Sequence, residues 1–187
     1  MKQAIAGVTP SEVQEVNVME VWPSIAKFTL GRLMGQLFGI QAGIYVFRVG
    51  NFCALAGIPF ALALYFFRLA PSFFGTPMHG GFYRLTNRRV IVLRNEIKFS
   101  GPSVLPKFIF GAEVKSVELD RFDSIEIERL PGHHWFDAGD LVFRLDGVET
   151  FRLEAVSRPD SFRQTCLKSG ASFVGIKQAL AREPVHA

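Results

Sequence analysis

The stretch VGNFCALAGIPFALALYFF, residues 49–67, decides how this chain is organised, because it runs for nineteen residues without a single charged side chain. A helix rises about 1.5 Å per residue and a bilayer core is roughly 30 Å thick, so this stretch comes close to spanning length. Gly50 and Asn51 suit a turn at its start, and Pro59 suits a kink within it. The stretch therefore predicts a membrane helix.

A second apolar stretch, residues 25–47, precedes it and is separated from it by Arg48. Its uncharged part, residues 33–47, is short for a span, and it reaches the required length only if Lys27 and Arg32 lie at the interface. We therefore predict a two-helix transmembrane hairpin over residues 25–70, after an N-terminal lead-in over residues 1–24 that ends with Ser24 as N-cap. The alternative is a pair of buried helices in a soluble α+β protein, but neither stretch has the polar face that such helices normally carry.

The distribution of charge supports a membrane rather than a nucleic acid as the partner. The formal net charge is +4, yet residues 21–95 contain eight basic residues and no Asp or Glu. A nucleic-acid-binding face would not be concentrated in the most apolar part of a chain, whereas anionic lipid attracts basic flanks of this kind. Since one Arg lies in the turn and the other basic residues lie outside it, we expect a multi-pass inner-membrane protein with both termini in the cytoplasm.

Glycines recur every fourth residue in the first apolar stretch, which is the pattern of a helix-packing groove. The second stretch contributes a matching small-residue stripe around Gly57. In lipid, such glycines allow close backbone approach and van der Waals contact. Two interpretations stay open, packing within the hairpin and a homo-oligomer. The helix-packing candidates are Gly31, Gly35, Gly39, Gly43 and Gly57.

After a Pro- and Gly-rich linker over residues 71–81, apolar residues alternate with polar ones, which is typical of strands with one solvated face. A helix with Phe162, Cys166 and Phe173 on one face follows. The predicted fold class is thus a membrane α-helical hairpin plus a β-rich domain over residues 82–182, with a tail over residues 183–187. The expected antiparallel strands cover residues 82–86, 89–93, 107–110, 114–119, 124–128, 141–145 and 150–155.

The β-rich domain resembles the bacterial pleckstrin-homology-like (PH-like) membrane proteins. Residues 83–91, YRLTNRRVI, are similar to the family's opening hairpin, written Tyr-x-hydrophobic-Thr-x-x-Arg-hydrophobic. Residues 138–143, AGDLVF, resemble a later strand, and Val156-Ser157-Arg158-Pro159 resembles the passage into the closing helix. The resemblance implies about seven antiparallel strands closed by one C-terminal helix, in a membrane-anchored module that is often oligomeric and generally without assigned catalysis.

Four arginines around the first hairpin are candidates for contact with lipid headgroups, because eukaryotic PH domains hold phosphoinositides with clustered basic residues near this position. Ordinary strand polarity and non-specific contact with anionic lipid is the competing interpretation, and the one we favour. The four residues are Arg84, Arg88, Arg89 and Arg94.

No residue is predicted to be catalytic, and no metal or other cofactor is expected. His133, His134, Asp137 and Asp140 concentrate metal-capable groups, but a zinc site needs three or four convergent ligands. The nucleotide-binding, zincin and hydrolase motifs are also lacking in the sequence. We expect a non-catalytic interaction or assembly module with an unidentified protein partner. The alternatives are a lipid-headgroup-sensing module and an accessory subunit of a membrane enzyme or transporter.

Overall fold

The structure is a computed structural model that describes residues 15–44, 47–69, 81–99 and 106–182. The predicted tail, most of the predicted linker and the first part of the lead-in lie outside the described residues. The elements are β1 (Asn17–Val21), η1 (Ile25–Lys27), α1 (Thr29–Phe38), β2 (Gly43–Ile44), β3 (Phe47–Arg48), α2 (Val49–Leu69), β4 (Gly81–Thr86), β5 (Arg89–Phe99), β6 (Pro106–Glu118), β7 (Ser124–Glu128), η2 (His134–Phe136), β8 (Ala138–Leu145), β9 (Val148–Ser157) and α3 (Pro159–Arg182).

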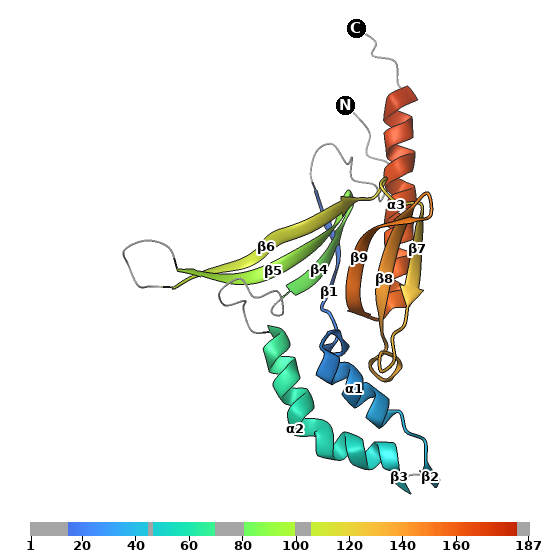
Figure 1. Ribbon diagram of the computed structural model, residues 1–187. Coiled ribbons are helices and arrows are strands. Elements are labelled where there is room, and N and C mark those ends of the chain that lie inside the picture. The colour runs from blue at the N-terminus through green and yellow to red at the C-terminus, as the bar shows by residue number, and fades with distance from the viewer. Residues whose placement is uncertain (1–14, 45–46, 70–80, 100–105, 183–187) are drawn as a thin grey trace.

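The β-rich part consists of two antiparallel sheets with α3 beside them, while α1 and α2 extend from one end of this unit (Figure 1). Within the described residues, one sheet has the order β1-β4-β5-β6 and the other the order β7-β8-β9. These seven strands differ from the predicted seven in two places. The strands expected over residues 107–110 and 114–119 form the single strand β6, and β1 comes from the predicted lead-in.

Strand β1 joins the sheet because its last residue fits the core. Val21 is paired with Tyr83 of β4 and is 9% exposed, whereas Glu20 faces the surface and forms an ion pair with Arg84. The residues before the apolar hairpin and those after it therefore form one sheet. The lead-in is part of the β-rich domain rather than a separate segment.

Two residues of the motif that carries the family resemblance, Tyr83 and Thr86, hold the β4–β5 hairpin in place. The Tyr83 hydroxyl donates to the Glu154 carbonyl oxygen at 2.8 Å and so ties β4 to β9 across the core. Burial raises the pKa of Tyr83 well above its ordinary value, so the phenol stays protonated and keeps donating. At the turn, Thr86 Oγ1 accepts the backbone N–H of Arg89 at 3.0 Å, which closes the hairpin.

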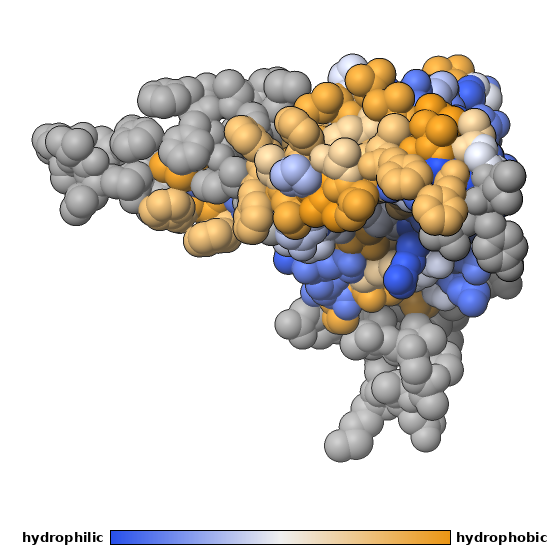
Figure 2. All heavy atoms as spheres, turned by 90° about the horizontal axis from the view of Figure 1, so that it is seen from below, coloured by the Kyte–Doolittle hydropathy of each residue, from blue (hydrophilic) through white to orange (hydrophobic). Residues whose placement is uncertain are grey.

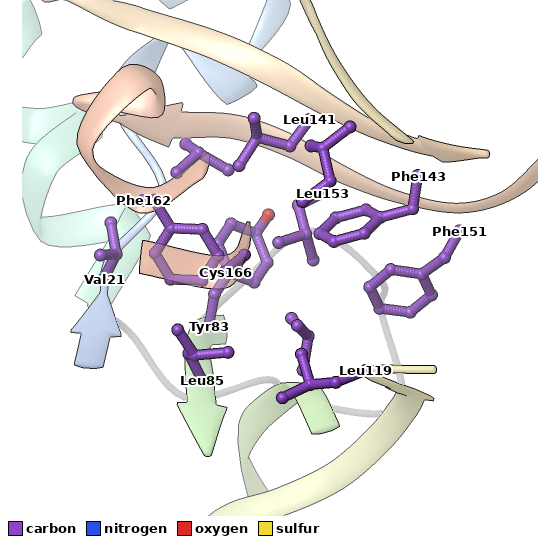
Figure 3. Packing of buried hydrophobic residues seen from close by; sticks show 13 residues of the cluster. Val21, Tyr83, Leu85, Leu119, Leu141, Phe143, Phe151, Leu153, Phe162 and Cys166 are labelled. Atoms are coloured by element: carbon purple, nitrogen blue, oxygen red, sulfur yellow. The ribbon is translucent and has the colours of Figure 1, made fainter. Parts of the chain in front are cut away.

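The core lies between the two sheets and the first turns of α3 (Figure 3). Phe143 on β8 is in edge contact with Phe151 on β9, with ring centroids 5.6 Å apart. Phe162 and Cys166 extend from α3 into the same cluster and are fully buried. The predicted closing helix with one apolar face is thus present, and it begins at Pro159 as the sequence suggested.

The first apolar stretch does not form the predicted spanning helix. Helix α1 has ten residues, which corresponds to about 15 Å and falls well short of a bilayer core of about 30 Å. It ends at Phe38 because Gly39 caps it and the following residues form the small β2–β3 ladder, where Gly43 has a φ of 120°. Only Val49–Arg68 in α2 is both long and apolar enough, among the described residues, to cross a membrane.

The hairpin is fastened to the β-rich domain where it starts and where it ends. Ser24 caps η1 as predicted, its Oγ accepting the Ala26 N–H, while its own backbone N–H donates to Ala155 of β9 at 2.7 Å. At the other end, the Arg68 guanidinium donates to the Pro23 carbonyl oxygen at 2.8 Å. Both ends of the hairpin therefore lie on the same side, next to β9.

Candidate membrane-contacting surface

Helix α2 is apolar on most of its circumference and leaves these side chains uncovered. Only 6% of its most apolar window is buried within the chain, and Leu55 and Phe66 are 68% and 67% exposed. A helix with large apolar residues all round needs an apolar environment, either a protein core or lipid. Since the described part of the chain supplies no such core for α2, these side chains are suited to contact with lipid or with another protein.

Basic side chains mark the two ends of α2, and a proline lies near its middle. Arg48 precedes the helix and Arg68 lies in its last turn, with no charged residue between them. This is the usual arrangement of an apolar helix whose ends reach the interface. The helix bends along its length (Figure 1), and Pro59 explains the bend because it lacks the N–H of a regular helical hydrogen bond.

Helix α1 extends this apolar surface. Leu30, Leu33 and Leu37 of α1 are 44% to 52% exposed. The view from the side of α1 and α2 shows hydrophobic side chains gathered over these helices, with hydrophilic ones beside them (Figure 2). Phe108 and Phe110 of β6 are also exposed and are stacked with centroids 6.4 Å apart. We call the exposed apolar residues of α1 and α2 the hairpin surface.

The four arginines predicted to contact headgroups are not gathered at the hairpin surface. Arg88 and Arg89 lie at the β4–β5 turn, the end of the sheet away from α1 and α2 (Figure 1). Arg94 is paired with Gly81 at the opposite end of β4. Two of the four are already neutralised, Arg84 by Glu20 at 2.7 Å and Arg89 on both sides.

The partners of Arg89 show why this cluster is a weak site for an anion. Its guanidinium bonds Glu15 at 2.9 Å and Glu113 at 2.9 Å. The hydrogen bond to Glu15 raises the pKa of Arg89, and the same contact lowers the pKa of Glu15. A phosphate approaching Arg89 would have to displace carboxylates that the strand order has placed there.

The predicted packing glycines separate into two groups. Gly31 and Gly35 are buried within the chain, where a side chain at Gly31 would meet the Ile25 carbonyl oxygen and one at Gly35 the Gly132 carbonyl oxygen. Gly57 of α2 faces the Phe38 ring. Gly39 and Gly43 lie beyond the end of α1 and share no helical face with the others. These glycines thus permit close approaches within the chain, two of them inside the hairpin and the one at Gly35 between α1 and the β domain.

The loop before η2, which contains Gly132 and His133, contacts α1 from the side of the β domain. His133 is 1% exposed, its Nδ1 lies 3.4 Å from the Leu130 backbone nitrogen, and it hydrogen-bonds the backbone of Ala26. Burial lowers the pKa of His133, so the neutral ring is favoured. His134 and Asp137, by contrast, are exposed. No group of three metal-capable side chains converges anywhere in the described part of the chain.

One cluster that sequence reasoning missed lies at the base of the hairpin. Lys27 and Arg32, expected only to reach the interface from a membrane helix, line a polar cavity together with residues of β8 and β9. No local pattern indicates this cavity, because its two sides come from residues 26–32 and 130–155, far apart in the sequence. In comparisons with known proteins, the chain matched no family model, no curated protein and no solved structure.

Proposed function

We propose that this protein is a non-catalytic, membrane-anchored module, in which the α1–α2 hairpin holds a PH-like β domain at the cytosolic face of the inner membrane for assembly with protein partners. The observation that carries the proposal is the exposed, uncharged surface of α2. Fully burying one Leu or Phe side chain is worth about 1.5–3 kcal/mol, so several such residues favour lipid strongly over water.

The PH-like part of the proposal is supported by the arrangement of the strands. The resemblance implied about seven antiparallel strands closed by one C-terminal helix, and the chain has a four-stranded and a three-stranded antiparallel sheet followed by α3, whose first turns pack into the core. The apolar hairpin is inserted between β1 and β4 of this plan. Both ends of the insertion return to the domain, which suits an anchor that brings the chain back to the side it left.

The surroundings of Cys166 and His133 support the non-catalytic part of the proposal. Cys166 is buried in the core, and burial raises the pKa of its thiol to about 12. His133 is bonded to backbone groups rather than to a nucleophile. Neither side chain is half of a nucleophile and base pair.

The assembly role is supported by the edge of the larger sheet. Strand β6 is the last strand of its sheet, and no described strand pairs with its outer edge. Val114 and Phe110 of this strand are exposed. An uncovered edge of thirteen residues is a ready template for another strand.

Membrane fractionation of the expressed full chain tests the anchor. The wild-type protein is expected in the membrane pellet after an alkaline carbonate wash. Leu55→Asp combined with Phe60→Asp should move most of it to the supernatant, because one charge at the centre of a membrane helix costs about 2.5–3.5 kcal/mol. The matched control, Leu145→Asp with Val148→Asp, changes two exposed apolar residues of the β domain and should stay in the pellet.

A wild-type protein that is released by carbonate would contradict the anchor, as would equal release of the two double variants.

Light scattering of the detergent-solubilised protein tests assembly. We expect a protein mass of two or more chains, or a second protein in stoichiometric amount. A solitary chain with no partner at any concentration would leave an anchor without an assembly role.

A further inference from the structure

A polar cavity of about 250 Å³ lies where the hairpin joins the β domain. Its walls come from η1 and α1 on one side and from β8, β9 and the loop before η2 on the other. Its volume is several times the roughly 30 Å³ that a water molecule occupies in the liquid. The polar residues that line it are Lys27, Arg32, His133, Asp140, Arg152 and Glu154.

The basic side chains of this cavity differ in how closely carboxylates pair with them. Arg152 is held by Glu128 at 2.8 Å, Glu149 at 2.9 Å and Asp140 at 3.2 Å. These contacts use its donors, so it serves as a wall. Asp140 is also occupied, since its Oδ1 accepts the Ala155 N–H at 2.8 Å.

Lys27 and Arg32 retain spare donors. The nearest carboxylate oxygen to the Lys27 ammonium belongs to Glu154, at 3.8 Å, and the Glu154 side chain is 60% exposed. No hydrogen bond or ion pair joins the Arg32 guanidinium to any residue that the structure describes, although Arg32 is half-buried. Burial lowers the pKa of Lys27, which is the expected response of a cation without a close counter-ion.

A second cavity, of about 210 Å³, lies on the other side of Arg32. It shares Arg32 and Leu130 with the polar cavity, and its other lining residues are uncharged: Thr29, Leu33, Gln36 and Pro131. Leu33 belongs to the hairpin surface and is 52% exposed. From the domain toward the hairpin surface, the surroundings of Arg32 thus change from charged to uncharged, with Leu33 on the side of the hairpin surface.

We propose that these two cavities bind one anionic phospholipid, with Lys27 and Arg32 donating to its phosphate and the start of its acyl chains lying against Leu33. This inference rests on the proposed membrane anchor. Glu154, the weakly paired carboxylate, is placed to accept a headgroup hydroxyl. A zwitterionic lipid fits less well, because its ammonium group would meet two cations that have no close counter-ions.

Titration of the detergent-solubilised full chain with short-chain phospholipids tests the site, with the thermal unfolding midpoint as the readout. A ligand that binds only the folded state raises this midpoint by more as the ratio of its free concentration to its Kd increases. Dioctanoyl phosphatidylglycerol is expected to raise it more than the matching phosphatidylcholine and phosphatidylethanolamine. Inorganic phosphate and glycerol 3-phosphate, run in parallel, should bind at least tenfold more weakly because they leave the apolar cavity empty.

The variants Arg32→Gln and Lys27→Gln should each weaken phosphatidylglycerol binding at least tenfold, and Arg32→Lys should restore part of the loss. Arg163→Gln is the matched control, since Arg163 is an exposed arginine on α3, away from the cavity. Because each residue is expected to contact the phosphate, either variant tests the site, and failure of one variant to fold leaves the other as the test. Carbonate extraction of the same variants separates the two proposals, because all of them should remain in the pellet.

Unchanged phosphatidylglycerol affinity in a folded Arg32→Gln or Lys27→Gln protein would overturn the inference. Equal responses to the three lipids would overturn the anionic preference, and equal affinity for inorganic phosphate would show a free-anion site instead of a lipid site. Loss of membrane retention in the wild-type protein would refute the anchor itself.

Discussion

Helices α2 and α3 are similar in length but belong to different environments. Helix α3 buries Phe162 and Cys166 completely and exposes Arg163 and Lys168, so it has one side for the core and one for water. Helix α2 exposes Leu55, Phe60 and Phe66 on a run with no charge. The comparison teaches that the placement of polar side chains, and not helix length or propensity, determines whether a helix completes a core or seeks another solvent.

The largest expected contrast comes from the same substitution in both helices. Phe162→Ala should lower the free energy of unfolding by about 3–5 kcal/mol, since it empties part of the core. Phe60→Ala, at a position that is 62% exposed, should change it by less than about 0.5 kcal/mol. Denaturant unfolding of the solubilised protein measures both, and similar losses would mean that α2 is packed in a core after all.

A smaller effect is expected where α1 connects α2 to the domain. Gly35→Ala places a methyl group against the Gly132 carbonyl oxygen and close to the Phe136 ring, so either α1 or the loop must shift, at a cost of about 1–3 kcal/mol. Gly39→Ala is the control, because its methyl group would lie 3.3 Å from the nearest atom outside its immediate neighbours. Limited proteolysis of the hairpin, together with unfolding, should distinguish the two. Equal behaviour would show that the glycine contact does not hold α1.

His133, which hydrogen-bonds Ala26 at the base of the hairpin, is expected to make the free energy of unfolding depend on pH. Burial lowers its pKa, with Arg32 acting in the same direction and Asp140, Glu128 and the Ala26 carbonyl opposing it. The unfolded chain therefore binds a proton more readily, so this contribution to stability is present above about pH 6.5 and is lost as the pH falls through the folded-state pKa. His133→Gln should flatten the pH profile of unfolding below pH 6.5. His134→Gln, at an exposed position, should not, and an unchanged slope in His133→Gln would contradict the assignment.

The smallest effect is a gain in stability in α3. Gly175 lies within the helix and a side chain there would meet nothing within 4 Å, so Gly175→Ala should stabilise the protein by about 0.5–1 kcal/mol. Gly57→Ala in α2 should bring no such gain, because the new methyl group meets the Phe38 ring. A rise of the unfolding midpoint in Gly57→Ala as large as in Gly175→Ala would indicate that α1 and α2 are not in contact.

The local patterns of the sequence predicted the sheets and α3 well, because alternation and helical periodicity are properties of neighbouring residues. The missed strand β1 depends on pairing with β4 across more than sixty residues, and no local pattern announces such a pairing. The helix predicted in the first apolar stretch was too long, because the glycines at 39 and 43 end the helix rather than continue it.

The surroundings of the candidate site residues were unpredictable for the same reason. Arg89 looked available because Glu15 and Glu113 are distant in sequence, although both lie beside it in the folded chain. Lys27 and Arg32 were expected only at the membrane interface, because the residues of β8 and β9 that complete their cavity are distant from them in the sequence. A run of charged residues can be recognised in the sequence. Whether the fold brings counter-ions to these residues, or gathers distant charges into one cavity, cannot.

The pairing of β1 with β4 also constrains how the protein is made. During synthesis, β1 emerges before the apolar hairpin and its partner only afterwards, so the larger sheet must wait until α2 has left the ribosome. In the proposed anchored state, α2 meets the membrane before β4 is made, and a hairpin held in lipid would reduce the entropic cost of closing the loop between β1 and β4. Insertion into the bilayer would thereby become a step of domain folding, and a chain that missed the membrane would be left with an open sheet, a target for quality-control proteases.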